Sequence, residues 1–342
     1  MQNQIKIFSI KSPEDFKDYE LLDTGEGEKL ERFGPYTFVR PYESAFWSKS
    51  LEKKSWENID GKFWSSKTGA QSTHARLASR AIAPGWKLEN NIKEKWEMSY
   101  KGIKFLASPT PFRHFGFFPE QAVHWDFIEE KILTPKKVFG VTPQGLALKE
   151  SKARPFPAIK FLNLFGYTGV ASLFALRAGA EVTHVDASKQ SLNWAKENQN
   201  LNSSLGDKPM RIIEDDVLKF LEREIKRGNK YDAVIMDPPK FGRGPKGETW
   251  KLEESLPKLL KLVQKVLSDE PLFVILTSYA VDFSALSLGY ALSEIMKPAR
   301  NASGIADAGG DQKGNLEVGE MCIFEKSNAR FIPLANTAVW SK

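Results

Sequence analysis

The chain has 342 residues, 41% of them hydrophobic, and is long enough for two domains with cores of their own. It carries 49 Lys and Arg against 43 Asp and Glu, and the resulting net charge of +6 is by itself weak evidence for nucleic-acid binding. A single cysteine excludes a disulfide framework, the N-terminal residues lack a signal-peptide pattern, and no apolar stretch approaches about eighteen residues. We therefore expect a soluble, cytoplasmic protein with no membrane partner.

Residues 1–110 contain short alternating runs, such as Tyr36–Arg40, separated by Gly and Pro. Alternation of this kind is typical of half-buried strands, so residues 1–110 are predicted to form a β-rich accessory domain. The run Trp96–Leu106 alternates around Lys101-Gly102, as in a β-hairpin. Residues 111–342 are expected to form a second, catalytic domain.

Positive charge and aromatic residues are interleaved between Lys62 and Lys104. This segment has nine basic residues and three acids, together with Phe63, Trp64, Trp86, Trp96 and Tyr100. Basic groups for phosphates and aromatic rings for bases suit an RNA-docking surface. The same pattern also suits the aromatic core of a small β-domain with a solvated charged face, and both interpretations stay open.

A connecting region is expected next. It comprises a helix over Pro119–Leu133, then residues 134–157 with four prolines and one strand at Val138–Val141. His114 and His124 have no companion ligands at short spacing, so we expect no metal site.

A nucleotide-binding βαβ unit follows. The strand Lys160–Phe165 leads into the turn Gly166-Tyr167-Thr168-Gly169, a helix over Val170–Ala178 and a strand over Glu181–Val185. Asp186, followed by Ala187 and Ser188, ends that strand, where a carboxylate can accept hydrogen bonds from ribose hydroxyls.

The turn of this unit has two glycines rather than the three of a dinucleotide fingerprint, and no Gly-Lys-Ser/Thr of a P-loop. A nucleoside without phosphates suits it better, which favours S-adenosylmethionine. The strand Met210–Ile213 then leads into Glu214-Asp215-Asp216-Val217, where a carboxylate and the next backbone N–H can bind the adenine edge. Each acid taken alone also suits a helix N-cap or a solvated loop.

The apolar run Tyr231–Met236 is too short for a helix and predicts a buried parallel strand. It ends in Asp237-Pro238-Pro239-Lys240-Phe241. Because proline cannot continue the strand pairing, this segment places a carboxylate and free carbonyls at the strand tip, where ligands bind in open α/β sheets. Asp-Pro is also common in ordinary turns. Helices are expected over Leu252–Leu267 and Ala285–Met296, a strand over Pro271–Leu276, and a loop over Asn301–Gly314.

Together, Asn163–Ser188, Glu214–Val217 and Asp237–Phe241 resemble the class I S-adenosylmethionine-dependent methyltransferases. More narrowly, they are similar to the bacterial large-subunit ribosomal RNA methyltransferases that carry Asp-Pro-Pro-Lys-Phe. The segment His114–Gln121 is similar to the aromatic lead-in of that branch. The resemblance spans about residues 112–340. It implies an α/β fold with a Rossmann-like seven-stranded sheet and a closing antiparallel hairpin, Leu316–Glu325 with Arg330–Val339.

The resemblance also implies roles for single residues. Gln121 and the turn Phe165–Gly169 would hold the methionine part of S-adenosylmethionine, and Asn163 would also contact this cofactor. Asp186, with Ala187 and Ser188, would bind the ribose. Asp215, Asp216 and Val217 would contact adenine. The catalytic set, which faces the methyl acceptor, would be Asp237, Pro238, Pro239, Lys240 and Phe241, with Asp237 also close to the cofactor.

Methyl transfer from a sulfonium requires in-line approach of a nucleophile and little covalent chemistry from the protein. Asp237 and the Pro238 carbonyl could orient an acceptor nitrogen, while Phe241 could stack on a base or serve as a core aromatic. Relatives that methylate carbon 5 of cytosine need a cysteine nucleophile. Here Thr277-Ser278-Tyr279 occupies that place and Cys322 lies in an apolar run, so a nitrogen of ribosomal RNA is the expected acceptor. A small-molecule or protein substrate, a cofactor-binding module without turnover, and a homo-oligomer stay open.

Overall fold

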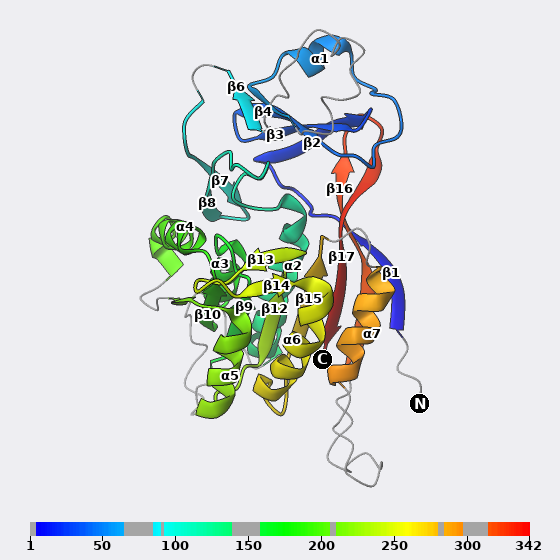
Figure 1. Cartoon of the computed structure of the whole chain (residues 1–342). Helices are drawn as coiled ribbons and strands as arrows, with labels where there is room; N and C mark the ends of the chain where they lie inside the picture. Colours follow the sequence, from blue (N-terminus) through cyan, green and yellow to red (C-terminus); the bar gives the residue numbers. More distant parts are fainter. Residues whose placement is uncertain are drawn as a thin grey trace. The chain divides into compact units, whose positions relative to one another are not determined.

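The computed structural model describes residues 5–64, 85–89, 92–138, 158–205, 210–279, 284–296 and 314–342. The chain divides into two compact units (Figure 1). The first comprises Met1–Lys11, Gln121–Met321 and Pro333–Lys342, and the second comprises Ser12–Glu120 and Cys322–Ile332. The expected division at residue 110 stays a prediction. Each of the two units is built from separate stretches of the chain. The connector strand expected at Val138–Val141 and the loop expected at Asn301–Gly314 fall almost entirely outside the described residues.

Seven consecutive strands of a 13-stranded sheet, in the order β11-β10-β9-β12-β15-β17-β16, form the sheet portion of the first unit. Its strands are β9 (Lys160–Leu164), β10 (Glu181–Asp186), β11 (Arg211–Glu214), β12 (Ala233–Met236), β15 (Phe273–Ser278), β16 (Asn315–Glu325) and β17 (Arg330–Ser341). Strands β9 to β12 and β15 pair in parallel, and β17 pairs with β15 antiparallel. A further strand, β1 (Ile5–Lys11), pairs with β16. The expected fold class, including the closing hairpin, is confirmed.

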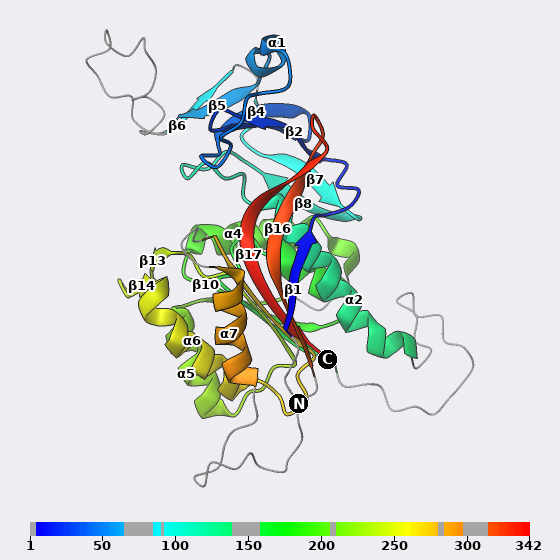
Figure 2. The same cartoon turned by 90° about the vertical axis from the view of Figure 1, so that its right-hand side faces the viewer.

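Helices cover both faces of this sheet, as Figure 2 shows for α2 on one side and for α5, α6 and α7 on the other. Their bounds are α2 (Ala122–Val138), α3 (Val170–Arg177), α4 (Lys189–Asn200), α5 (Val217–Arg227), α6 (Leu252–Val266) and α7 (Ala285–Met296). Because both faces are covered, the central strands are continuous apolar runs, and Val234, Met236 and Leu276 are fully buried against α6 and its neighbours. No helix among the described residues is long and apolar enough to cross a membrane.

The second unit is a β-rich body. The strands β2 (Tyr19–Gly25), β3 (Glu28–Phe33) and β4 (Tyr36–Pro41) form a meander extended by β5 (Gly61–Trp64) and β6 (Gly85–Leu88). The hairpin expected around Lys101-Gly102 is present as β7 (Trp96–Tyr100) and β8 (Ile103–Ala107). Both turn residues have positive φ, as a tight two-residue turn requires. A short helix, α1 (Lys53–Glu57), completes the unit.

The aromatic residues of the basic segment belong to the core of this second unit. Trp96 and Tyr100 are buried, and the Trp96 ring stacks on Phe38. Phe63 is also buried and contacts Trp86 edge-on. Two of the basic residues around them pair with acids, Lys62 with Glu28 and Lys104 with Glu97. For these residues the structure favours the interpretation as a domain core, while Lys67, Arg76 and Arg80 lie outside the described ranges.

Candidate cofactor and acceptor site

The strand register brings the predicted residues to one edge of the sheet. Leu164, the end of β9, pairs with Val185 of β10 on one side and with Met236 of β12 on the other. Phe165 therefore emerges between Asp186 and Asp237. These two acids are two strand spacings apart, roughly 10 Å. A ligand lying across the tip of β9 can contact both carboxylates.

The turn after β9 has an unusual backbone. Phe165, Tyr167 and Gly169 have φ values of 58°, 53° and 83°, in a region that non-glycine residues seldom adopt. At Gly166, a Cβ atom would lie 2.3 Å from the ring of His184, so any larger residue would displace the turn. The sequence therefore commits this turn to a conformation that costs free energy, which is typical of ligand-binding segments.

A buried polar network holds the turn from below. Asn163 donates through Nδ2 to Ser172 Oγ at 2.9 Å, and Ser172 Oγ lies 3.0 Å from His184 Nδ1. His184 Nε2 lies 3.3 Å from the Tyr167 carbonyl. Burial lowers the pKa of His184 to about 4, so the ring is neutral at pH 7 and carries its proton on Nε2, facing that carbonyl. Asn163 thus donates to Ser172 beneath the turn, and its predicted contact with the cofactor stays a prediction.

Asp186 is held as a hydrogen-bond acceptor at the edge. Its Oδ2 accepts from the Tyr167 N–H at 2.9 Å, and its Oδ1 accepts from the Ser188 N–H at 2.8 Å. Burial raises the pKa of Asp186, and these backbone donors offset only part of that rise. Ser188 is the N-cap of α4 and accepts from the Ser191 N–H. Ala187 lies between Asp186 and Ser188 in the chain.

The third predicted tip follows β11. Asp216 is the N-cap of α5 and accepts from the Lys219 N–H at 3.0 Å, while Asp215 forms an ion pair with Arg223. Val217 is buried as the first residue of α5. The capping role seen here is one that the sequence left open, and the predicted adenine contact of these residues stays a prediction.

The tip of β12 combines a held carboxylate with exposed residues. Gln121 donates through Nε2 to Asp237 Oδ2 at 3.1 Å and contacts the Tyr279 hydroxyl at 3.2 Å. Pro238 is buried, whereas Pro239 and Lys240 are exposed. Phe241 is 57% exposed, so it is not a core aromatic.

Trp250 connects this tip to the turn after β9. It lies on β14 (Thr249–Lys251), which pairs with β13 (Phe241–Arg243). Its Nε1 donates to the Pro239 carbonyl at 2.7 Å, and its ring meets the Phe165 ring edge-on, with centroids 4.8 Å apart. One buried side chain therefore contacts both segments that the sequence assigned to cofactor and acceptor.

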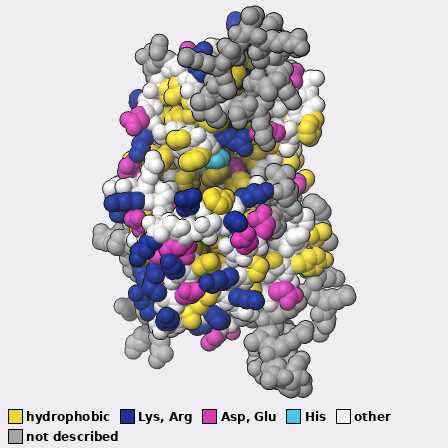
Figure 3. Space-filling view, in the orientation of Figure 1, with side chains coloured by type: hydrophobic (Ala, Val, Ile, Leu, Met, Phe, Trp, Pro, Cys, Tyr) yellow, Lys and Arg dark blue, Asp and Glu magenta, His cyan; other side chains and the backbone are white. Residues whose placement is uncertain are grey.

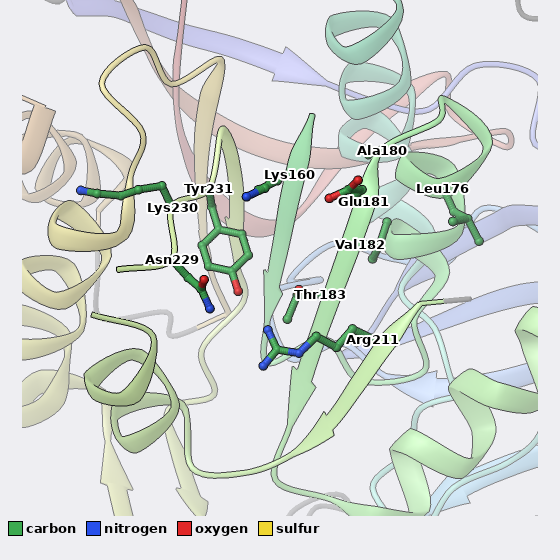
Figure 4. Close-up of a pocket in the computed structure, with 10 residues that line it drawn as sticks. All are labelled: Lys160, Leu176, Ala180, Glu181, Val182, Thr183, Arg211, Asn229, Lys230 and Tyr231. Carbon is green, nitrogen blue, oxygen red and sulfur yellow. The ribbon is translucent and has the colours of Figure 1, made fainter. Parts of the chain in front are cut away.

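A cavity of about 420 Å³ lies at the opposite, amino edge of the same strands. In Figure 4, Tyr231, Thr183 and Arg211 point toward one another in this cavity. Beside it the fully buried Glu224 accepts from Tyr231, Asn229, Arg227 and Arg211. The hydrogen-bonding capacity of Glu224 is filled by these protein donors. We therefore interpret this ionic cluster, which we call the Glu224 cluster, as structural, and the cavity beside it not as a second reaction site.

The residues at the carboxyl edge fit S-adenosylmethionine. The Asp186 carboxylate is a suitable acceptor for a pair of ribose hydroxyls. The N-cap of α3 is Gly169, which offers no side chain to the first N–H groups of the helix, and such groups favour a carboxylate like that of the methionine part. Within the described ranges, no group of three or more His, Cys, Asp or Glu could hold a metal ion.

Several residues of the site were not identified from the sequence. His184 and Ser172 support the turn, Asn198 donates to the Thr168 carbonyl at 2.9 Å, and Trp250 joins the two tips. Only His184 left a signal, since a histidine inside an otherwise apolar strand must find a hydrogen-bond partner.

Comparison with known proteins agrees with this geometry. Residues 148–274 match the family model described as "Conserved hypothetical protein 95". The chain is 32% identical over 143 residues to ribosomal RNA large subunit methyltransferase K of Neisseria meningitidis, covering 40% of each protein. It is 30% identical over 208 residues to methyltransferase K/L of Alteromonas mediterranea, covering 59% of this chain and 26% of that protein. The chain thus spans less than half the length of these curated relatives.

A solved structure matches the whole chain. The SAM-dependent methyltransferase from Agrobacterium tumefaciens is 35% identical, with a TM-score of 0.78, and the match covers 100% of this chain and 97% of that one.

Proposed function

Because this chain belongs to the S-adenosylmethionine-dependent methyltransferases, we propose that it methylates a nitrogen of RNA, and specifically of ribosomal RNA. The observation that carries this proposal is the tip of β12. There a held carboxylate, Asp237, is followed within four residues by an exposed aromatic ring, Phe241. The relatives named above as ribosomal RNA methyltransferases support RNA as the substrate. In this proposal, residues 111–342 perform the transfer in the cytoplasm, and residues 1–110 are an accessory domain.

S-adenosylmethionine, bound by Asp186 and the turn after β9, supplies a methyl group on a positively charged sulfur. The protein then has to orient the acceptor in line with that methyl group. Asp237 accepts an N–H bond from an exocyclic amine and directs its lone pair, and the Pro238 carbonyl is a second acceptor. The Pro239 carbonyl already accepts from Trp250, which fixes the backbone of this turn. Phe241 offers a stacking face, and stacking of this kind contributes about 1–3 kcal/mol per base.

Cysteine placement favours nitrogen over ring carbon. Covalent activation of a pyrimidine carbon requires an accessible thiolate. The chain has one cysteine, Cys322, and its side chain is buried in β16 at 2% exposure. The end of β15 carries Thr277 and Ser278 instead.

Surface charge gives the proposal little support. In Figure 3, Lys and Arg side chains gather over α5 and α6, mixed with acidic ones. Many of these cations are paired: Lys219 with Glu248, Lys258 with Glu222, Arg223 with Asp215 and Arg227 with Glu224. RNA is therefore proposed from the tip of β12 and from the relatives, not from a basic face.

The test is transfer of tritiated methyl from S-adenosylmethionine to ribosomal RNA purified from a strain that lacks the gene, followed by nucleoside mass spectrometry. We expect one methylated nitrogen. Asp237→Ala should lower the rate by roughly 100-fold, because the acceptor is no longer oriented. Asp232→Ala is the matched control, since Asp232 precedes the same strand at the opposite edge, where it accepts from the Lys160 N–H. Label in small molecules or protein, with none in RNA, would overturn the choice of substrate.

A further inference from the structure

His124, which the sequence offered only as an unsupported metal ligand, lies in a hydrogen-bonded chain that ends at Asp237. Asp237 Oδ2 accepts from Gln121 Nε2 at 3.1 Å, and Gln121 Oε1 lies 2.9 Å from His124 Nδ1. His124 Nε2 lies 3.0 Å from Thr337 Oγ1 on β17. Gln121, His124 and Thr337 are buried, so no competing water weakens these contacts from bulk solvent.

We propose that His124 and Thr337 are positioning residues for methyl transfer, because they fix the Gln121 amide with its N–H₂ group on Asp237. This inference rests on the proposed role of Asp237 at the methyl acceptor. It concerns residues that do not touch substrate themselves.

The chemistry of the four groups allows one arrangement of protons. A carboxylate only accepts, so Gln121 must turn its N–H₂ group toward Asp237 and its oxygen toward His124. That oxygen also only accepts, so His124 must carry a proton on Nδ1. Burial lowers the pKa of His124 to about 3, so the neutral ring has no second proton. Nε2 is therefore an acceptor and receives the hydroxyl proton of Thr337 at 3.0 Å, a shorter contact than the 3.4 Å between the same hydroxyl and the Leu276 carbonyl.

The second proton of the Gln121 amide also has a partner. Gln121 Nε2 lies 3.2 Å from the Tyr279 hydroxyl as well as 3.1 Å from Asp237. A reversed amide would place its oxygen against the Asp237 carboxylate and lose that hydrogen bond, whereas the Tyr279 hydroxyl can donate to an amide oxygen as well as accept from an amide N–H. The Nδ1–H of His124 is what prevents this reversal, since it can bond the amide oxygen but not the amide nitrogen.

Two substitutions of His124 by amide side chains test the roles of the two ring nitrogens separately. In His124→Asn the side-chain amide reaches the Nδ1 position and can still donate to Gln121. In His124→Gln the amide reaches the Nε2 position and leaves the Gln121 oxygen without its donor. We expect His124→Gln to lower the methyl-transfer rate about tenfold, the cost of one lost buried hydrogen bond to an orienting group. His124→Asn should stay within about threefold of the wild-type rate.

Substitutions of Thr337 provide a second pair of variants. Thr337→Ser keeps the hydroxyl that donates to Nε2 and should retain the rate, whereas Thr337→Val removes it and should lower the rate severalfold. Thermal melting of all four variants controls for folding. Equal losses in His124→Asn and His124→Gln, at equal melting temperature, would overturn the proposal.

A readout without substrate tests the arrangement itself. Long-range ¹H–¹⁵N NMR of the full chain should show His124 as the Nδ1–H tautomer at pH 7. An Nε2–H tautomer would overturn the proposal whatever the activity. Conversely, a wild-type chain that transfers no methyl to RNA would defeat the proposed function, while the tautomer would still decide the orientation of Gln121.

Discussion

Asp186, which is half-buried, and Glu224, which is fully buried, are two carboxylates at opposite edges of one sheet, and their pKa values are shifted in opposite directions. Burial raises the pKa of Asp186, and the backbone donors around it offset only part of the rise. Burial alone would also raise the pKa of Glu224, but its donors Arg211, Tyr231, Asn229 and Arg227 outweigh it and hold the pKa at about 2. The fold therefore stabilises the charged form of Glu224, whereas it disfavours the charged form of Asp186.

The comparison shows which feature marks a functional edge. The cavity and the dense ionic cluster are both at the amino edge, yet every acceptor position of Glu224 is used by the protein. At the carboxyl edge, Asp186 is half-buried, and its backbone donors offset only part of the rise in its pKa. A carboxylate of that kind gains from a ligand that donates hydrogen bonds, and such groups concentrate at functional sites.

The largest expected effect on stability is at Glu224. Glu224→Gln would turn an N–H₂ group toward donors that need an acceptor, so the free energy of unfolding should fall by about 2–3 kcal/mol. Urea denaturation measures it. Affinity for S-adenosylmethionine should be unchanged, and a loss of affinity would mean that the two edges are not independent.

Acid should act on the same residue. The folded-state pKa of Glu224, about 2, lies below its ordinary value of 4.5, so the stability it contributes is present above pH 4.5 and is lost as the pH falls toward 2. Over that range the free energy of unfolding should decline more steeply for wild type than for Glu224→Gln. Parallel curves for the two proteins would contradict this account.

At the carboxyl edge the effect should be on binding instead. Asp186→Asn removes the charged acceptor for ribose, and affinity for S-adenosylmethionine should fall about tenfold, or about 1.4 kcal/mol. Asn keeps an oxygen for one of the two backbone donors of Asp186, and the charge that is removed is one that burial disfavours, so the free energy of unfolding should fall by about 1 kcal/mol, less than in Glu224→Gln. Calorimetric titration and urea denaturation of the same preparation give both values, and a large loss of stability would contradict the comparison.

The smallest effect is expected at Trp250. Trp250→Phe keeps the ring against Phe165 but removes the hydrogen bond to the Pro239 carbonyl, worth about 1 kcal/mol, so the transfer rate should fall roughly fivefold. Trp250→Leu also removes the aromatic contact and should lower cofactor affinity as well. Identical behaviour of the two variants would show that the indole N–H has no separate role.

Local sequence was enough to predict the sheet and its tips. Short apolar runs such as Tyr231–Met236 are buried on both faces, and parallel strands place their carboxyl ends at one edge, so Asp186 and Asp237 were expected at the same edge of the sheet. The glycines at 166 and 169 marked the turn because no other residue fits there.

Contacts between distant residues could not be predicted in this way. Gln121 and Asp237 are 116 positions apart, and His124 and Thr337 are 213 apart, so no spacing rule connects them. Trp96 and Tyr100 were ambiguous for another reason. The alternation of a strand shows that two faces differ, but not whether the aromatic face meets a core or a ligand.

The hairpin between β16 and β17 sets a condition on synthesis. Its tip, Cys322–Ile332, is part of the second unit, where Ser327 bonds Asp23 and the Lys326 N–H donates to the Leu21 carbonyl. The amino-terminal body, which ends at Glu120, is therefore incomplete on the ribosome until the tip beginning at Cys322, about 200 residues further along the chain, has been translated. Removing residues 1–110 to obtain an isolated catalytic fragment would leave that tip without its partners Asp23 and Leu21. The two units are therefore best expressed together.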